Sequence, residues 1–270
     1  MTTADPKQPA AYGFVTEAAK RSVAHVQDYV LLSARAVTNV LSPPFYIGDL
    51  FEQMDIIGVG SLPIVLLTGF FIGAVMVLQT ASQFARFGQT ALTGDVVAIG
   101  LVRELGPTIT GLLVAGRVSS GIASELGSML VTEQIDAMRA MGTDPSRKLV
   151  MPRVVATILM LPLLTAMADF VGLIGGWLVA ASTLRLGAVE FWTRALHALS
   201  FSDIMQGMSK PLFFGFILST VGCYQGLKVQ GGTQGVGRAT TQAVVVSSVF
   251  ILVTNFFLTR VMLFLAGKGV

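Results

Sequence analysis

Charge is what this chain has little of. Only 12% of its 270 residues are Asp, Glu, Lys or Arg, against roughly 25% in an average soluble domain. Hydrophobic residues make up 53%, and the mean hydropathy is +0.73. A water-soluble domain of this length cannot enclose so much apolar surface in one core, because its own surface must stay polar or mixed. A disordered chain is excluded as well, since such chains are poor in apolar residues. The composition predicts a protein that lives in lipid.

Cysteine and histidine are also scarce, and no catalytic group of residues stands out. The single cysteine, Cys223, excludes a disulfide framework and a multi-cysteine metal site. The string at 116–121 holds two serines but lacks the neighbouring base that a serine nucleophile needs, because His25 and His197 lie far away in the sequence. The glycine-rich stretch 230–237 has no Lys-Ser/Thr after its glycines, so it is not a Walker A loop. We expect a flexible turn there, no enzyme activity, and no cofactor bound by this chain.

Long charge-free runs predict the membrane spans. A bilayer core of about 30 Å requires roughly 20 apolar residues in a helix. Five runs satisfy this, and the first begins too deep in the chain to be a signal peptide. The sequence therefore predicts an all-α membrane protein with five transmembrane helices, at about residues 59–85, 93–124, 151–184, 206–228 and 239–266.

The residues before the first span have a different pattern. Pro43-Pro44 would end a helix there. We interpret residues 17–44 as an amphipathic helix lying in the membrane interface, preceded by a disordered tail at 1–16 and followed by the membrane domain at 45–270. The alternative is a cytoplasmic helix packed on a partner. The apolar stripe that predicts this helix consists of Val23, Val26, Val30, Ala34, Val37 and Leu41.

The distribution of Lys and Arg predicts the orientation, since cytoplasmic segments of membrane proteins carry an excess of both. With five spans and a cytoplasmic N-terminus, eleven of the 18 Lys and Arg residues fall on the cytoplasmic side. Two more, Arg103 and Arg260, lie within or near spans. We therefore expect a multi-pass protein with its N-terminus in the cytoplasm and its C-terminus outside. The five cationic residues assigned to the outside are Arg86, Arg185, Arg194, Lys210 and Lys268.

The second span is interrupted by an ionisable pair. Arg103 and Glu104 are adjacent, so they point to different sides of a helix, and an arginine at mid-membrane costs on the order of 3 kcal/mol. Gly106-Pro107 follows, and the proline removes a backbone donor and tends to kink the helix. One interpretation is a cavity wall or a moving joint. The other is an ion pair to another span that fixes the packing.

A short helix is predicted between spans two and three, on the cytoplasmic side. Thr132 would cap it, Glu133 would lie in its first turn and Gly142 would end it. An exposed short helix with a methionine ridge suits insertion into a groove of a partner. The alternative is a helix packed under its own bundle. The apolar ridge is formed by Ile135, Met138 and Met141, flanked by Glu133, Asp136 and Arg139.

Three further features of the sequence are each compatible with more than one role. Asp169 in the third span is either a buried hydrogen-bonded residue or part of a polar path. The external loop from 185 to 210 holds Phe191, Trp192 and His197 on an amphipathic stretch, and aromatic residues there anchor at lipid headgroups more often than they bind a ligand. Small-residue patterns that allow close helix approach or dimerisation occur at Gly69/Gly73, Gly172/Gly176 and Gly222/Gly226.

From about residue 45 onward the chain resembles the MlaE/YrbE family, the permease subunits of ABC transporters that work with MCE proteins. A second block, 237–245, matches where it enters the last span. The strings that carry the resemblance are Arg103-Glu-Leu-Gly-Pro107, Ala115-Gly-Arg117, Glu125-Leu-Gly127, Thr132-Glu-Gln134, Asp136-Ala-Met138, Met141-Gly142, Asp144-Pro145 and Pro152-Arg153.

The resemblance implies an interfacial helix followed by five spans in the inner membrane. It also implies a dimer of permeases, two cytoplasmic ATPase subunits that hold ATP and Mg, an MCE-domain protein outside the membrane, and lipid in a cavity between the permease copies. The short helix from Thr132 to Met141 then corresponds to the coupling helix that docks on the ATPase. The residues expected to couple to the ATPase are Glu133, Ile135, Asp136, Met138, Arg139 and Met141.

The sequence thus predicts a non-catalytic permease subunit that moves phospholipid or a related lipid. The lipid cavity and hinge are expected at Arg103, Glu104, Leu105, Gly106 and Pro107. Two other classes stay open. An ion-coupled secondary transporter would use the ionisable residues inside the spans, although internal repeats are absent. A membrane scaffold that transports nothing would not need them.

Overall fold

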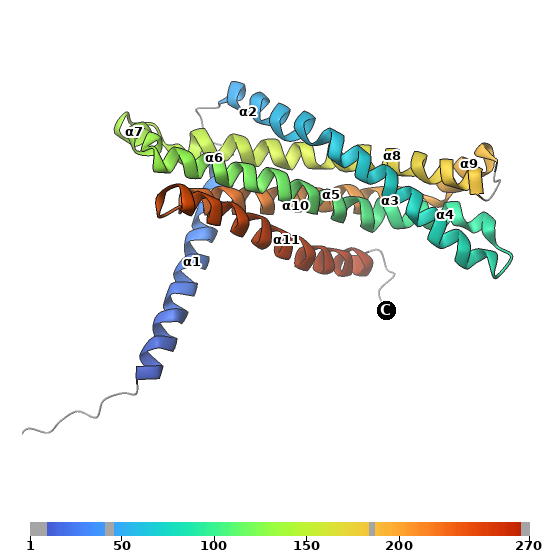
Figure 1. Cartoon of the computed structure of the whole chain (residues 1–270), viewed down its shortest axis with the longest axis horizontal. Helices are drawn as coiled ribbons and strands as arrows, with labels where there is room; N and C mark the ends of the chain where they lie inside the picture. The colour runs from blue at the N-terminus through green and yellow to red at the C-terminus, as the bar shows by residue number, and fades with distance from the viewer. Residues whose placement is uncertain (1–9, 41–45, 184–186, 266–270) are drawn as a thin grey trace, which may run out of the picture.

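The computed structural model describes residues 10–40, 46–183 and 187–265, and every element within these ranges is a helix or a helical turn. Most of them form an elongated bundle of roughly parallel and antiparallel helices (Figure 1). Four helical stretches are long and apolar enough to cross a membrane, so the expected all-α membrane architecture is confirmed. These stretches are Ile47–Ala85, Thr93–Val131, Ser146–Thr183 and Gly232–Leu265.

Three of the four stretches are composite, because π-helical turns interrupt their α-helices. The first contains α2 (Ile47–Met54), η1 (Asp55–Val59) and α3 (Gly60–Ala85). The second follows the 3-10 turn η2 (Thr90–Leu92) and contains α4 (Thr93–Gly100), η3 (Leu101–Leu105), α5 (Gly106–Val114), η4 (Ala115–Ser119) and α6 (Ser120–Val131). The third contains η5 (Ser146–Val150) and α8 (Met151–Thr183), and the fourth is α11 (Gly232–Leu265).

The helix α10 (Phe201–Leu227) occupies the place of the expected fourth span at 206–228. It packs against α6, α8 and α11. It is not among the four stretches apolar enough to cross, so the count of five spans remains a prediction. The assignment of Lys210 to an external loop is wrong, because this residue lies inside α10 with its side chain buried.

The N-terminal helix α1 (Ala10–Val40) begins earlier than the predicted residue 17, so residues 10–16 are helical rather than part of a tail. Residues 1–9 and 41–45, which include Leu41 and Pro43-Pro44, lie outside the described ranges. Figure 1 shows α1 leaving the bundle at a steep angle to the other helices. Polar contacts fasten it to α10: Tyr29 to Thr220 at 3.0 Å, His25 to Tyr224 at 3.1 Å, and an ion pair of Asp28 with Lys228.

Glycine permits the close approach of α3 and α8. A Cβ atom at Gly73 would lie 1.8 Å from the carbonyl oxygen of Gly172, and one at Gly69 would lie 2.6 Å from that of Ala168. Such distances are impossible for real side chains, so the two backbones touch only because these positions are glycine. The expectation that these patterns allow close helix approach is confirmed here, within a single chain.

Two short helices lie at opposite ends of the bundle (Figure 1). α7 (Gln134–Ala140) follows α6, and α9 (Ala188–Ala198) follows α8. The glycine-rich stretch 230–237 is not the flexible turn that we expected. Most of it belongs to α11, which begins at Gly232 rather than at 239. The tight turn before it uses positive φ values at Gly231 (88°) and Gly232 (66°), which glycine adopts without strain.

Candidate functional site

The second stretch is interrupted where the ionisable pair was noticed. Arg103 and Glu104 lie in the π-helical turn η3, immediately before Gly106 and Pro107. Pro107 has no N–H, so it cannot donate to the carbonyl oxygen of Arg103, the residue four positions earlier. The ammonium of Lys210 on α10 donates a hydrogen bond to that oxygen at 2.9 Å. A side chain from another helix thus replaces the backbone donor that the proline removes.

Both members of the ionisable pair bind α10. Lys210 forms an ion pair with Glu104 at 2.7 Å, and the Lys210 side chain is only 1% exposed. The hydroxyl of Thr259 on α11 also donates to Glu104, at 3.2 Å. Arg103 pairs with Asp203 at 3.3 Å. Asp203 and Lys210, the partners of the two residues, therefore lie on one face of α10. The pair links η3 to two further helices.

Asp203 also caps the N-terminus of α10 together with Ser200. Its carboxylate accepts hydrogen bonds from the backbone N–H (3.0 Å) and the hydroxyl (2.7 Å) of Ser200, whose hydroxyl oxygen accepts in turn from the Asp203 N–H at 3.3 Å. This reciprocal arrangement is a capping box, which satisfies N–H groups that a helix start leaves free. Arg103 therefore binds a carboxylate that is already held in place.

Of the two interpretations offered for Arg103 and Glu104, the structure shows ion pairs, and both partners lie on the helix α10. Although the two residues are adjacent, both side chains reach α10. The reason is that Asp203 and Lys210 lie seven residues apart, about two helical turns on one face.

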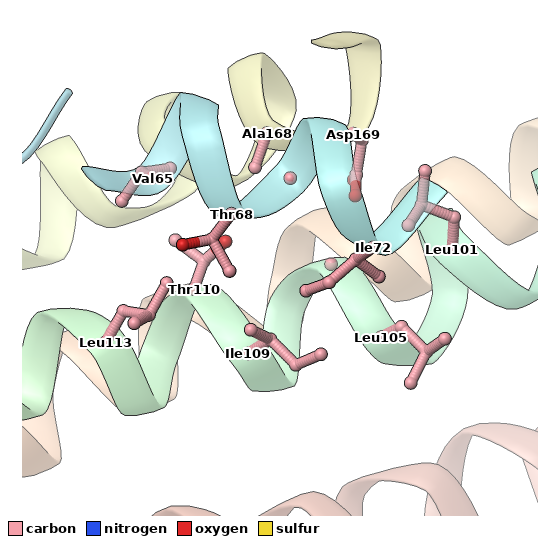
Figure 2. Close-up of a pocket in the computed structure, with 12 residues that line it drawn as sticks. Val65, Thr68, Ile72, Leu101, Leu105, Ile109, Thr110, Leu113, Ala168 and Asp169 are labelled. Carbon is pink, nitrogen blue, oxygen red and sulfur yellow. The ribbon is translucent and has the colours of Figure 1, made fainter. Parts of the chain in front are cut away.

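Leu105 and Gly106 line a small cavity between α3, α5 and α8. Figure 2 shows Thr68 and Ile72 of α3 facing Ile109 and Leu113 of α5 across it. The volume open to the centre of a water molecule is about 10 Å³, which is the room that one water needs. In this single chain the cavity is too small for a lipid.

Asp169 lies at the wall of this cavity, with its carboxylate directed towards the segment that follows η3 (Figure 2). It is 7% exposed, and its Oδ1 atom has no hydrogen-bond partner among the described residues. A Cβ atom at Gly106 would lie 1.7 Å from Oδ1. The interpretation of Asp169 as a buried hydrogen-bonded residue is therefore wrong for this oxygen. A side chain at position 106 would displace this carboxylate.

Two further arginines join spans at the α7 end of the bundle. Arg117 in η4 donates to the carbonyl oxygen of Ile56 at 3.1 Å and to the hydroxyl of Ser61 at 2.9 Å, so it ties the second stretch to the first. Arg153 on α8 is 4% exposed and pairs with Glu125 on α6 at 2.7 Å. Charged groups thus hold the composite stretches together at both ends.

The short helix α7 turns its apolar ridge inward. Ile135 is fully buried and Met138 is half-buried against the main core. Met141 is 74% exposed. The alternative of a helix packed under its own bundle therefore holds for the first two residues, while Asp136 and Arg139 form an exposed ion pair at 2.8 Å.

The ends of α7 differ in part from the expectation. Thr132 does not cap α7; its hydroxyl donates back to the carbonyl oxygen of Ser128 at 2.8 Å, at the end of α6. Glu133 occupies the N-cap position in the left-handed conformation, with φ +60°, rather than the first turn. Gly142 ends the helix with φ +79°, as expected.

The sequence indicated the ionisable pair in the second span but not the residues on α10 that bind it. Arg103 and Glu104 were found because they interrupt an apolar run, whereas Asp203 and Lys210 were assigned to a loop. No structural role was assigned from the sequence to three further charged residues in the strings that match the family, Arg117, Glu125 and Arg153. A signal was present for Lys210, since it lies seven residues after Asp203 and directly before Pro211 in a helical pattern.

Comparison with known proteins identifies the family of this chain. Residues 50–261 match the family described as Permease MlaE. A probable ABC transporter permease protein of Rickettsia felis is 42% identical over 244 residues, covering 89% of this chain and 94% of the relative. The chloroplastic protein TRIGALACTOSYLDIACYLGLYCEROL 1 of Arabidopsis thaliana is 36% identical over 239 residues, covering 88% and 68%.

A third relative carries a functional name. The intermembrane phospholipid transport system permease protein MlaE of Haemophilus influenzae is 36% identical over 214 residues, covering 79% of this chain and 82% of the relative. The family match over residues 50–261 includes both η3 and α7, the two segments singled out from the sequence. The chain belongs to the MlaE family of ABC transporter permeases.

Proposed function

We propose that this chain is the non-catalytic permease subunit of an ABC transporter that moves phospholipid or a related lipid between the cytoplasmic membrane and an MCE-domain partner. Separate cytoplasmic ATPase subunits bind ATP and Mg and hydrolyse the nucleotide. The observation that carries the proposal is family membership together with the buried charged group inside the second span. Charged residues within spans mark transport paths more often than plain anchors.

We further propose that two permease copies associate through α11. The most apolar window of α11 is only 6% buried, against 33–44% for the other three candidate spans. Its exposed side carries large residues along its whole length, more than a single chain covers. The small cavity of one chain is also consistent with a lipid site completed by a second copy. The exposed residues include Val245, Val249, Val253, Phe256, Phe257 and Phe264.

The proposed topology has five spans, with α10 as the fourth, a cytoplasmic N-terminus and an external C-terminus. The orientation rests on the excess of Lys and Arg that the sequence predicts on the cytoplasmic side. α1 is the interfacial helix of this topology. Val23, Val26 and Val30 are 55–65% exposed although they are apolar. A helix that leaves the bundle steeply and exposes such a stripe is suited to the membrane interface.

The ATPase docking surface consists of the outer side of α7 and its two ends. Glu133, Asp136, Arg139 and Met141 are exposed there and keep the coupling role expected from the sequence. Ile135 and Met138 act through packing instead, because they fix α7 to the core. Closure of the ATPase would move α7 together with α6, and hence the arginine contacts beyond it.

The lipid path passes beside η3. π-Helical turns are frequent at functional sites, and both they and prolines are places where helices bend, so Pro107 lets the second span bend. Arg103 and Glu104 border the path with their ion pairs, near the polar part of the lipid. Reversing one charge, as in Arg103→Glu or Glu104→Lys, is expected to impair lipid transfer when transfer is measured below the lowered Tm of the variant, at a temperature where the complex with the ATPase still assembles.

The experiment that tests the proposal is purification in mild detergent, followed by mass spectrometry of the proteins and lipids that accompany the chain. The expected result is an ABC ATPase, an MCE-domain protein and phospholipid. Recovery of the folded chain without an ATPase would overturn the proposal. Transfer of lipid that follows a proton gradient without ATP would instead favour a secondary transporter, and variants in η3 that change only abundance would favour a scaffold.

A further inference from the structure

The short helix α9 has two apolar faces, of which its own chain covers only one. Phe191 and Ala195, one turn apart, are fully buried, and Phe191 lies against Gly94 of α4. Val189 and Leu196 lie on another side of the helix and are 81% and 62% exposed. A helix needs only one apolar face to pack on its own bundle. The second face requires another explanation.

Trp192 completes the exposed face. The spacing of Val189, Trp192 and Leu196 is three and four residues, which places them along one stripe. Trp192 packs edge-to-face on the buried Phe191, with ring centroids 6.1 Å apart, and is only partly covered. His197 lies beside the stripe on the same helix. The stripe is an accessible apolar surface with an indole at its centre.

Other exposed aromatic residues gather at the same end of the bundle. Phe87, just after α3, is 77% exposed, and Phe201, the first residue of α10, is 79% exposed. With Trp192 they come from two connections between long helices, α3 to α4 and α8 to α10. Tryptophan at the ends of spans marks the level of the lipid headgroups, where its amphipathic ring is favoured, and the two phenylalanines add apolar surface at the same end. A protein partner on α9 alone would not account for the exposed phenylalanine in the other connection.

The polar side of α9 fits the same position. Arg194 forms an ion pair with Asp95 of α4 at 3.7 Å, which fixes how the helix is turned about its axis. Glu190 and His197 are exposed. A helix with charged groups on one side and Val, Trp and Leu on another is typical of helices that lie in the plane of the interface.

We propose that α9 lies in the headgroup layer of the membrane at the end of the bundle opposite α7, with Val189, Trp192 and Leu196 in contact with acyl chains. The occupant of the exposed face is the phospholipid of that leaflet. Since α9 packs on α4, and α4 continues directly into η3, this contact holds the ion-paired segment at a fixed depth in the bilayer. The assignment requires only that the long helices span a membrane, so it stands or falls separately from the lipid cargo.

Tryptophan fluorescence tests this, because Trp177 and Trp192 are the only two tryptophans in the chain. The variant Trp177→Phe leaves Trp192 as the reporter in vesicles of phosphatidylcholine with bromine either near the glycerol end or near the far end of the acyl chains. We expect about twofold stronger quenching by the bromine near the glycerol, as for an indole at headgroup level. Absence of quenching in both vesicles would overturn the proposal, as would stronger quenching by the distant bromine.

A matched pair of second substitutions checks the face. In the Trp177→Phe background, Leu196→Asp places a charge on the apolar stripe and should lower the quenching by about half, because a carboxylate withdraws from the acyl region. Glu190→Gln changes the polar side and should leave the quenching unchanged. Equal quenching in both variants would show that the stripe is not the surface in contact with lipid. Co-purification with an ATPase is measured on the same samples, so a failure of the proposed function is recognised separately.

Discussion

Lys210 of α10 and Arg103 of η3 are joined by a hydrogen bond from the ammonium to the backbone carbonyl oxygen, 2.9 Å long. This oxygen is the one that Pro107 leaves without its usual helical donor. The same ammonium pairs with Glu104. The buried Lys210 ammonium therefore has two roles. It donates to the carbonyl oxygen that lacks a backbone donor, and it neutralises the charge of the Glu104 carboxylate.

We expect Lys210→Met to destabilise the folded chain strongly. Methionine fills a similar volume but leaves the Arg103 carbonyl without this donor and Glu104 without its cation. Removing one partner of a fully buried pair costs on the order of 3 kcal/mol, and the cost is smaller here because the Glu104 side chain is 37% exposed. Thermal unfolding in detergent should show a clearly lower Tm. An unchanged Tm would mean that water replaces the lysine at no cost.

A charge exchange separates the two roles of Lys210. Glu104→Lys alone brings two ammonium groups together and should lower the Tm as Lys210→Met does. The double variant Glu104→Lys with Lys210→Glu restores opposite charges but not the hydrogen bond to the Arg103 carbonyl, because a carboxylate cannot donate. We expect it to recover part of the lost Tm. Complete recovery would show that the carbonyl bond contributes nothing.

The contact between α3 and α8 gives a second prediction. Gly73→Ala forces the two backbones apart, since its Cβ would lie 1.8 Å from the Gly172 carbonyl oxygen. Overpacking of a core costs about 1–3 kcal/mol, and more where the obstacle is backbone. Gly116→Ala is the matched control within a span, because no atom lies within 4 Å of its Cβ position. We expect a reduced Tm for the first variant only.

Most of the fold could be predicted from the sequence, because long apolar runs and helical periodicity are local signals. The limits of α8 and α10 agree closely with the predicted spans. The π-helical turns could not be predicted. Whether a helix inserts an extra residue, as in η3, depends on what a distant helix offers, and here Lys210 lies 107 residues from Arg103.

The candidate site was predicted in position but not in detail. Arg103 and Glu104 were identified because charge is rare within spans, yet their partners depend on the neighbouring helix. The inward turn of α7 was only one of two alternatives in the sequence, for a related reason. A ridge of Ile135, Met138 and Met141 reads the same whether it faces the core or a partner, and only the tertiary structure decides between the two.

The inward turn of α7 changes which substitution tests the coupling surface. Met141→Asp alters an exposed side chain and should leave the Tm within a few degrees of the parent value. We expect it to reduce the amount of ATPase recovered with the permease several-fold. Met138→Asp buries a charge and should lower the Tm directly. If Met141→Asp retains normal ATPase association, the tip of α7 is not a docking contact.

Glu133 is the only described residue other than glycine with a positive φ, at +60°. The left-handed conformation costs an ordinary residue about 1 kcal/mol or more, and glycine adopts it freely. Glu133→Gly should therefore raise the Tm, whereas Glu133→Ala, which keeps the strain, should not. If the Glu133 carboxylate contacts the ATPase, both variants should recover less ATPase despite their different stabilities. A glycine variant that is more stable and recovers normal amounts of ATPase would show that the strained conformation serves neither docking nor stability.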